Sequence, residues 1–260
     1  MGGRGIALGG GGLGAIILAV IACLMGADPA QILEGLTGGA PPQTQQQQQP
    51  ANRAANNAPD ENRQFVGAIM GSLEDTWRRV LPQQSRVRYQ DPQLVLFTGQ
   101  VSSACGYGDA AVGPFYCPGD NKLYLDFSFF NELCREFKAP GDFAQAYVIA
   151  HEFGHHIQNL TGVMGRVQRQ GQNNALSVAL ELQADCYAGI WAKSTQDRLE
   201  PGDIEEALRA ASAVGDDNIQ RRTQGFVVPD SFTHGSAAQR QKAFAIGMQS
   251  GDMRQCETFR

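Results

Sequence analysis

The chain has 260 residues, a length that suits one sizeable domain with additional segments. Apolar residues make up 42% of it, so most of the chain can bury a hydrophobic core. The 21 basic and 26 acidic residues are mixed along the sequence and give a net charge of -5, which argues against nucleic acid as a partner.

The N-terminal segment, residues 1–28, is predicted to anchor the chain in a membrane. Its stretch IALGGGGLGAIILAVIACLM carries no charged side chain, and about 20 apolar residues suffice for a helix to cross a bilayer. Arg4 supplies the positive flank, which places the N-terminus in the cytoplasm and the rest of the chain beyond the membrane. Two alternatives stay open: a cleaved signal peptide, and a lipoprotein modified at Cys23 of the lipobox-like VIAC.

Residues 29–61 are predicted to form a flexible linker rich in Gln, Pro and Asn. From Gly38 onward this stretch has almost no large apolar side chain, so burial cannot offset the entropy of ordering it. The globular domain is therefore assigned to residues 62–260.

Five cysteines lie in this domain, which is expected outside the cytoplasm. Cys105 and Cys117 flank a Gly-rich loop of suitable length for a local disulfide. One more disulfide is expected among Cys134, Cys186 and Cys256. We favour Cys186 with Cys256, but the sequence does not choose between the pairings, and fully reduced thiols are the alternative.

Hydrophobic periodicity predicts an α+β domain that is mostly helical, with a small antiparallel sheet. The first helix spans residues 63–81 and is ended by Pro82. Two strands follow with the cysteine loop between them, and the remaining segments are helices, the first of them with Asp142 as its N-cap. The predicted strands are 93–101 and 122–130, and the later helices are 142–160, 175–195, 200–215 and 236–251.

The stretch HEFGHH lies within the helix predicted for residues 142–160. His151 and His155 are four residues apart and share one helix face, so both imidazoles can bind one Zn²⁺. Glu152 beside them can reach a water on the metal and act as general base, which is the chemistry of the H-E-x-x-H motif. His156 points about 100° away from His155, which favours a packing role.

A third ligand is expected on the next helix, in LELQAD. Glu181 lies in a run of Ala, Leu and Val, where a charge is costly unless it is paired. We predict that Glu181 completes the coordination and that Asp185, one turn later, accepts the second N–H of a ligand histidine. An acidic pair on a solvated helix face is the alternative.

His234 and Arg240 lie together near the end of the chain, in PDSFTHGSAAQR. His234 either stabilises the oxyanion of a tetrahedral intermediate or only forms the turn before the last helix. Arg240 is expected to pair with a carboxylate near the site.

These motifs resemble the neutral zinc metallopeptidase family of bacterial membrane-anchored proteins. The similarity is carried by AYVIAHEFGHHIQ, LELQADCYAGIW, EPGDIEEAL, VPDSFTHGSAAQR and the Gly-rich N-terminus. The chain is more distantly similar to gluzincins and CAAX-prenyl-peptidase-like enzymes, in which a Glu on a second helix is the third ligand. The resemblance implies a zincin-type fold whose strand before the active helix receives the substrate backbone, and residues 122–130 occupy that place. Related enzymes tend to carry His-Pro where this chain has His234-Gly235, so the oxyanion role stays open.

Together these features predict a zinc-dependent endopeptidase, single-pass in the bacterial inner membrane, with its catalytic domain in the periplasm. Peptides or proteins are the expected substrates. The alternative is a membrane-tethered binding or scaffold protein with a structural or vestigial zinc site, which should have four protein ligands. A non-haem Fe(II) oxygenase, also built on two histidines and a carboxylate, is a third candidate.

Overall fold

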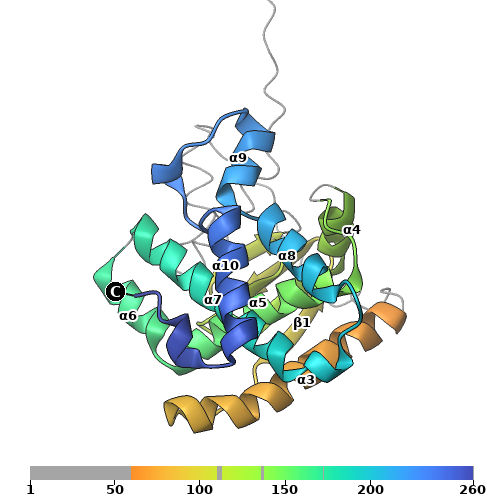
Figure 1. Cartoon of the computed structure of the whole chain (residues 1–260), viewed down its shortest axis with the longest axis vertical. Coiled ribbons are helices and arrows are strands. Elements are labelled where there is room, and N and C mark those ends of the chain that lie inside the picture. The colour runs from red at the N-terminus through yellow and green to blue at the C-terminus, as the bar shows by residue number, and fades with distance from the viewer. Residues whose placement is uncertain (1–59, 110–112, 136–137, 172, 260) are drawn as a thin grey trace, which may run out of the picture.

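The computed structural model describes residues 60–109, 113–135, 138–171 and 173–259 (Figure 1). The predicted anchor and nearly all of the predicted linker lie outside these residues. In the described part of the chain, no helix is both long and apolar enough to span a bilayer. The fold is mostly helical with a small amount of β structure, as the sequence predicts.

The elements follow one another with short connections. In chain order they are α3 (Asp60–Ser85), β1 (Gln93–Phe97), β2 (Gln100–Ser103), β3 (Gly106–Asp109), β4 (Phe115–Cys117), β5 (Lys122–Asp126), α4 (Phe127–Arg135), α5 (Asp142–Leu160), α6 (Val163–Gln170), α7 (Asn174–Ser194), η2 (Gln196–Arg198), α8 (Asp203–Ala213), α9 (Asp216–Gln224), η3 (Pro229–Ser231), α10 (Ala237–Ser250) and η4 (Met253–Cys256).

The main sheet is mixed, so the prediction of an antiparallel sheet is wrong for one of its two strand pairs. Its strand order is β1-β5-β4, with β1 parallel and β4 antiparallel to β5. The chain between β1 and β5 is long enough for a crossover because it contains the separate antiparallel hairpin β2–β3. Gly99, at φ +86°, divides the predicted strand 93–101 into β1 and β2.

The strand predicted for residues 122–130 ends at Asp126, and helix α4 begins immediately after it. The Asp126 carboxylate accepts hydrogen bonds of 2.8 Å from both the backbone N–H and the hydroxyl of Ser128, which stabilises the first turn of α4. The apolar run that follows Asp126 therefore belongs to a buried helix face, which periodicity in so short a segment does not distinguish from a strand.

Two further predicted boundaries differ from the structure. Helix α3 continues past Pro82 to Ser85, because a proline so close to the helix end removes little of the hydrogen-bond ladder. Asp142 is the first residue of α5, and its N-cap is Gly141. The Phe143 N–H is satisfied from another helix, by the Glu206 carboxylate of α8 at 3.2 Å.

The core is built around α7, which packs against both α5 and α10 (Figure 1). Glycines allow this close packing. A Cβ at Gly154 of α5 would lie 2.9 Å from the Ala184 carbonyl oxygen of α7, and one at Gly247 of α10 would collide with the Cys186 carbonyl. The chemistry-bearing faces of the three helices are thereby brought together.

Both expected disulfides are present. Cys105–Cys117 joins the turn of the β2–β3 hairpin to β4, and Cys186–Cys256 joins α7 to η4. Cys134 has an exposed free thiol. The second disulfide fixes the C-terminal segment behind the helix that carries Glu181.

Candidate metal centre

Three side chains from α5 and α7 converge at the centre of the helical layer. His151 Nε2 lies 3.1 Å from one carboxylate oxygen of Glu181, and His155 Nε2 lies 3.5 Å from the other. One ligand atom from each residue falls within 4.8 Å of the other two. The i, i+4 spacing on α5 thus produces the shared face expected of it, and Gly154 lets α7 bring Glu181 opposite.

This donor set fits a zinc ion. Two imidazoles and one carboxylate are common zinc ligands, and all three residues are buried. The Nε2 atom of His155 is buried and has no hydrogen-bond partner among the residues that the structure describes. Buried polar atoms in native proteins are nearly always satisfied, so a cation bound between the imidazoles and the carboxylate accounts for this atom.

The outer nitrogen of His151 contacts a charged network. Its Nδ1 lies 2.8 Å from Asp185 Oδ1, and Arg240 of α10 donates to both oxygens of Asp185 at 2.8 and 2.9 Å. The hydroxyl of Tyr147 also donates to Asp185. Asp185 and Arg240 therefore lie where the sequence predicts, beside a candidate ligand histidine.

The charged forms of Asp185 and His151 are favoured in this network although both side chains are buried. Burial raises the pKa of Asp185, but Arg240 and then His151 outweigh it and lower the value to about 2. Burial lowers the pKa of His151, but the Asp185 carboxylate overcomes this and raises it to about 9. In the metal-free protein both ring nitrogens of His151 are therefore protonated at neutral pH, and a metal ion must displace the proton on Nε2.

The outer nitrogen of His155 has a neutral partner. Its Nδ1 lies 2.8 Å from the side-chain oxygen of Gln158, one turn further along α5. Burial lowers the pKa of His155 to about 4, so this ring is neutral and can offer a lone pair.

Glu152 is buried beside the ligand group and contacts the sheet. Its carboxylate accepts a hydrogen bond of 3.0 Å from the backbone N–H of Tyr116 in β4. Burial raises its pKa to about 8, against the lowering effect of His151. A carboxylate with a pKa near neutrality can both take up and return a proton.

The strand that contacts Glu152 is β4. This corrects the prediction that residues 122–130 receive the substrate backbone. The predicted strand, now β5, lies in the middle of the sheet and pairs with neighbours on both sides. Its backbone groups are occupied, whereas β4 is an edge strand. The backbone N–H of Tyr116 in β4 donates to Glu152. This N–H points to the edge of β4 opposite to the one that pairs with β5.

His234 is held by Asp216, a residue that the sequence analysis missed. One Asp216 oxygen accepts the backbone N–H groups of Thr233, His234 and Gly235 at 2.8, 2.6 and 2.9 Å. The other lies 3.3 Å from His234 Nδ1. In the sequence, Asp216 is only an Asp at the start of a helix, and such a residue ordinarily indicates a charge that stabilises the helix N-terminus.

The His234 ring lies within electrostatic reach of the ligand group. Burial raises the pKa of Glu181, but its electrostatic interactions with His155 and then His234 lower it well below its usual range. His156, in contrast, faces away from the centre. Its two ring nitrogens contact the Tyr116 hydroxyl at 3.1 Å and the Gln90 carbonyl at 2.7 Å.

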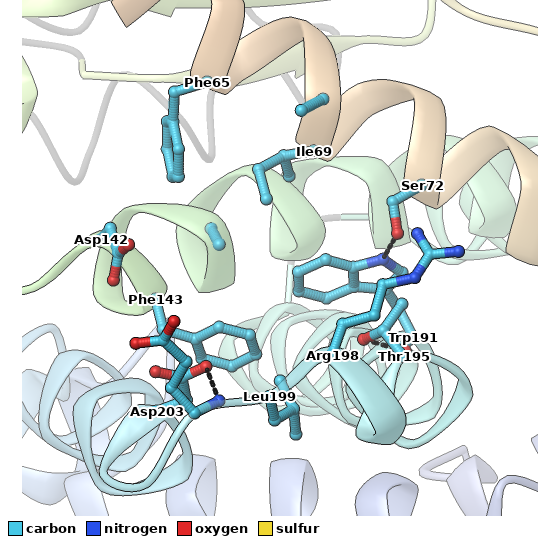
Figure 2. Close-up of a pocket in the computed structure, with 13 residues that line it drawn as sticks. Phe65, Ile69, Ser72, Asp142, Phe143, Trp191, Thr195, Arg198, Leu199 and Asp203 are labelled. Atoms are coloured by element: carbon cyan, nitrogen blue, oxygen red, sulfur yellow. Dashed lines mark hydrogen bonds between the residues drawn. The ribbon is translucent and has the colours of Figure 1, made fainter.

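A separate cavity of about 260 Å³ lies at the other end of α5, between α3, the end of α7 and the start of α8 (Figure 2). Phe143 and Trp191 form its floor, and the Trp191 ring N–H donates to Ser72 Oγ at 3.0 Å. Asp142 on its rim precedes His151 by nine residues, roughly 13 Å along a helix. The cavity contains none of the metal-centre residues.

The buried site therefore defines a class of protein: one with a centre of two histidines and a glutamate beside a further buried glutamate. Over residues 1–259 the sequence matches the family described as "Putative neutral zinc metallopeptidase", and the chain belongs to that family.

Two relatives are similar to this chain over most of its length. "Uncharacterized protein YpfJ" of Escherichia coli (strain K12) is 45% identical over 269 aligned residues, covering 100% of this chain and 91% of the relative. "Uncharacterized protein Rv2575" of Mycobacterium tuberculosis (strain H37Rv) is 49% identical over 208, covering 75% and 69%. No solved structure matches the chain.

Proposed function

We propose that the protein is a zinc-dependent endopeptidase. The observation that carries this proposal is the position of Glu152, a buried carboxylate beside a group of three ligands, His151, His155 and Glu181. A structural zinc site is normally closed by four protein ligands, whereas a catalytic one has three and keeps a position for water or substrate. The same comparison disfavours a scaffold whose zinc is structural.

Zinc, when bound by the three ligands, would polarise a peptide carbonyl and acidify water. Glu152 takes a proton from the attacking water and later returns it to the leaving amine. Its burial supports this exchange, because burial raises the pKa of the Glu152 carboxylate and so strengthens it as a base. Asp185 keeps Nδ1 of His151 directed away from the centre, so that Nε2 faces inward.

The substrate backbone is expected to lie along the edge of β4 that pairs with no other strand of the described residues. An extended peptide adds to an open strand edge through main-chain hydrogen bonds, and this edge faces Glu152. With both ring nitrogens protonated, His234 would donate its Nδ1–H to Asp216 and its Nε2–H to the developing oxyanion.

We further propose that residues 1–28 anchor the protein in the bacterial inner membrane and that the peptidase domain faces the periplasm. The two disulfides support an oxidising compartment. Protease digestion of spheroplasts should degrade the domain without lysis, and mass analysis of the N-terminus should find it uncleaved and Cys23 unmodified. Protection of the domain until lysis would contradict the periplasmic orientation.

The enzymatic proposal is tested with Glu152→Gln and a pool of quenched-fluorescence peptides. We expect the variant to bind one zinc per chain like the wild type while cleavage falls about 10²- to 10⁴-fold. If the zinc-loaded wild type cleaves nothing across the pool, the peptidase assignment is wrong. If Glu152→Gln cleaves at the wild-type rate, Glu152 is not the base.

A further inference from the structure

Two buried glutamines in series connect His155 to the C-terminal segment. His155 Nδ1 lies 2.8 Å from Gln158 Oε1. The Gln158 amide nitrogen donates to the Leu180 carbonyl at 2.7 Å and to Gln183 Oε1 at 3.1 Å. The Gln183 nitrogen donates in turn to the Cys256 carbonyl at 3.1 Å. All five residues are at most 3% exposed, so water does not compete for these bonds.

These hydrogen bonds form a relay from His155 through Gln158 and Gln183 to the Cys256 carbonyl. The Cys256 end determines which group donates in each bond. A backbone carbonyl can only accept, so Gln183 must turn its NH₂ group toward Cys256 and its oxygen toward Gln158. The same reasoning at Leu180 directs the Gln158 NH₂ group away from His155. The oxygen of Gln158 then faces His155 Nδ1 and accepts its N–H, which leaves the Nε2 lone pair facing the Glu181 carboxylate.

The final acceptor is itself held in place. The Cys256 side chain is bonded to Cys186 of α7, next to Asp185 in sequence. Close by, the Thr258 hydroxyl donates to the Ala179 carbonyl of the same helix at 2.6 Å. The relay thus ends on a segment fixed to the helix that carries Glu181.

We propose that Gln158 and Gln183 are positioning residues that impose the Nδ1–H tautomer and the orientation of His155, with the Cys186–Cys256 disulfide holding the last acceptor of the relay. The inference rests on the proposed function in one respect, that His155 is a zinc ligand.

The tautomer can be read directly, because the chain has only four histidines. The imidazole ¹⁵N and ¹H shifts of zinc-free, full-length protein would be recorded, with His155 identified by its loss in His155→Gln. We expect a single Nδ1–H form in the wild type and a mixture of tautomers in Gln158→Leu. A predominantly Nε2–H ring in the wild type would overturn the proposal.

Zinc affinity gives the second readout, measured by competition with a chromophoric chelator. We expect Gln158→Leu to bind zinc about 10- to 100-fold more weakly, and Gln183→Leu to show a smaller loss. The double variant should lose no more than Gln158→Leu alone, because the first substitution already disconnects the relay. Gln241→Leu is the matched control: its amide also donates to a backbone carbonyl, that of Leu208 at 2.9 Å, but outside the relay.

The outcomes separate this inference from the function on which it rests. Wild-type zinc affinity in Gln158→Leu, additive losses in the double variant, or an equal loss in Gln241→Leu would each overturn the relay and leave the peptidase proposal intact. A wild type that binds no zinc would overturn both. The d–d spectrum of the Co²⁺-substituted protein should change in Gln158→Leu and not in Gln241→Leu, a difference that loss of packing alone does not produce.

Discussion

The two candidate ligand histidines lie one turn apart on α5, yet their outer nitrogens have opposite environments. His151 faces the Asp185 carboxylate, which is paired with Arg240, whereas His155 faces the neutral amide of Gln158. The same task, orienting an imidazole, is therefore performed once by charge and once by an uncharged relay. The orientation of His151 therefore depends on pH and on the intact ion pair between Asp185 and Arg240. The orientation of His155 depends mainly on the geometry of its hydrogen bond to Gln158.

The largest effect is expected from Asp185→Ala, on the charged side. Arg240 would stay buried without its main partner, and breaking a buried pair in this way costs about 3–5 kcal/mol. Denaturant unfolding of the metal-free protein measures the loss. Asp185→Ala combined with Arg240→Ala should cost less than the sum of the single variants, and full additivity would show that the pair is not coupled.

Removal of the Cys186–Cys256 disulfide should have the next largest effect. This bond closes 70 residues, so replacing both cysteines with alanine should lower the free energy of unfolding by about 4 kcal/mol in the chain-entropy estimate. The matched control is Cys105–Cys117, which closes 12 residues and should cost about 3 kcal/mol. Only the first pair should also weaken zinc binding. Equal effects of both pairs on zinc would contradict the link between η4 and His155.

The pH dependence of zinc binding should distinguish the two sides. His151, with a pKa of about 9, must lose a proton to bind zinc, so the affinity of the wild type should rise up to that pH, by about tenfold per pH unit. Asp185→Asn removes the charge that raises this pKa, so the rise should end at lower pH. Gln158→Leu should keep the wild-type slope. The measurement is the apparent zinc Kd from about pH 6 to about pH 9, and identical profiles for all three proteins would contradict the asymmetry.

The smallest effect is expected from His156→Gln. This third histidine of α5 contacts Tyr116 and Gln90 and lies outside the ligand group, so the variant should lose about 1 kcal/mol of stability and keep wild-type zinc affinity. The two are measured by thermal unfolding and chelator competition. A loss of zinc binding comparable to that of Gln158→Leu would mean that any disturbance of α5 affects the centre.

The parts of the site that local periodicity controls could be predicted from the sequence. The pairs His151 with His155 and Glu181 with Asp185 each follow from i, i+4 spacing in an apolar helix. Asp216 and Gln158 could not, because an Asp at a helix start and a Gln within a helix are ordinary residues until their partners are known. The contact between Glu152 and Tyr116 spans 36 residues and depends on the packing of β4 against α5.

The fold shows the same division. A long helix such as α7 is recognisable because its apolar run persists over several turns, longer than a strand would be. Strands β2, β3 and β4 have three or four residues each, too few for a pattern to register. The parallel pairing of β1 with β5 is a long-range contact that neither strand encodes alone.

The most direct measurement is a crystal structure of the full-length protein loaded with zinc, with the ion located by its anomalous scattering. We predict one zinc bound by Nε2 of His151, Nε2 of His155 and the Glu181 carboxylate at about 2.0–2.2 Å, with a non-protein ligand facing Glu152. A fourth protein ligand in that position, or zinc bound away from α5 and α7, would contradict the assignment of a catalytic centre.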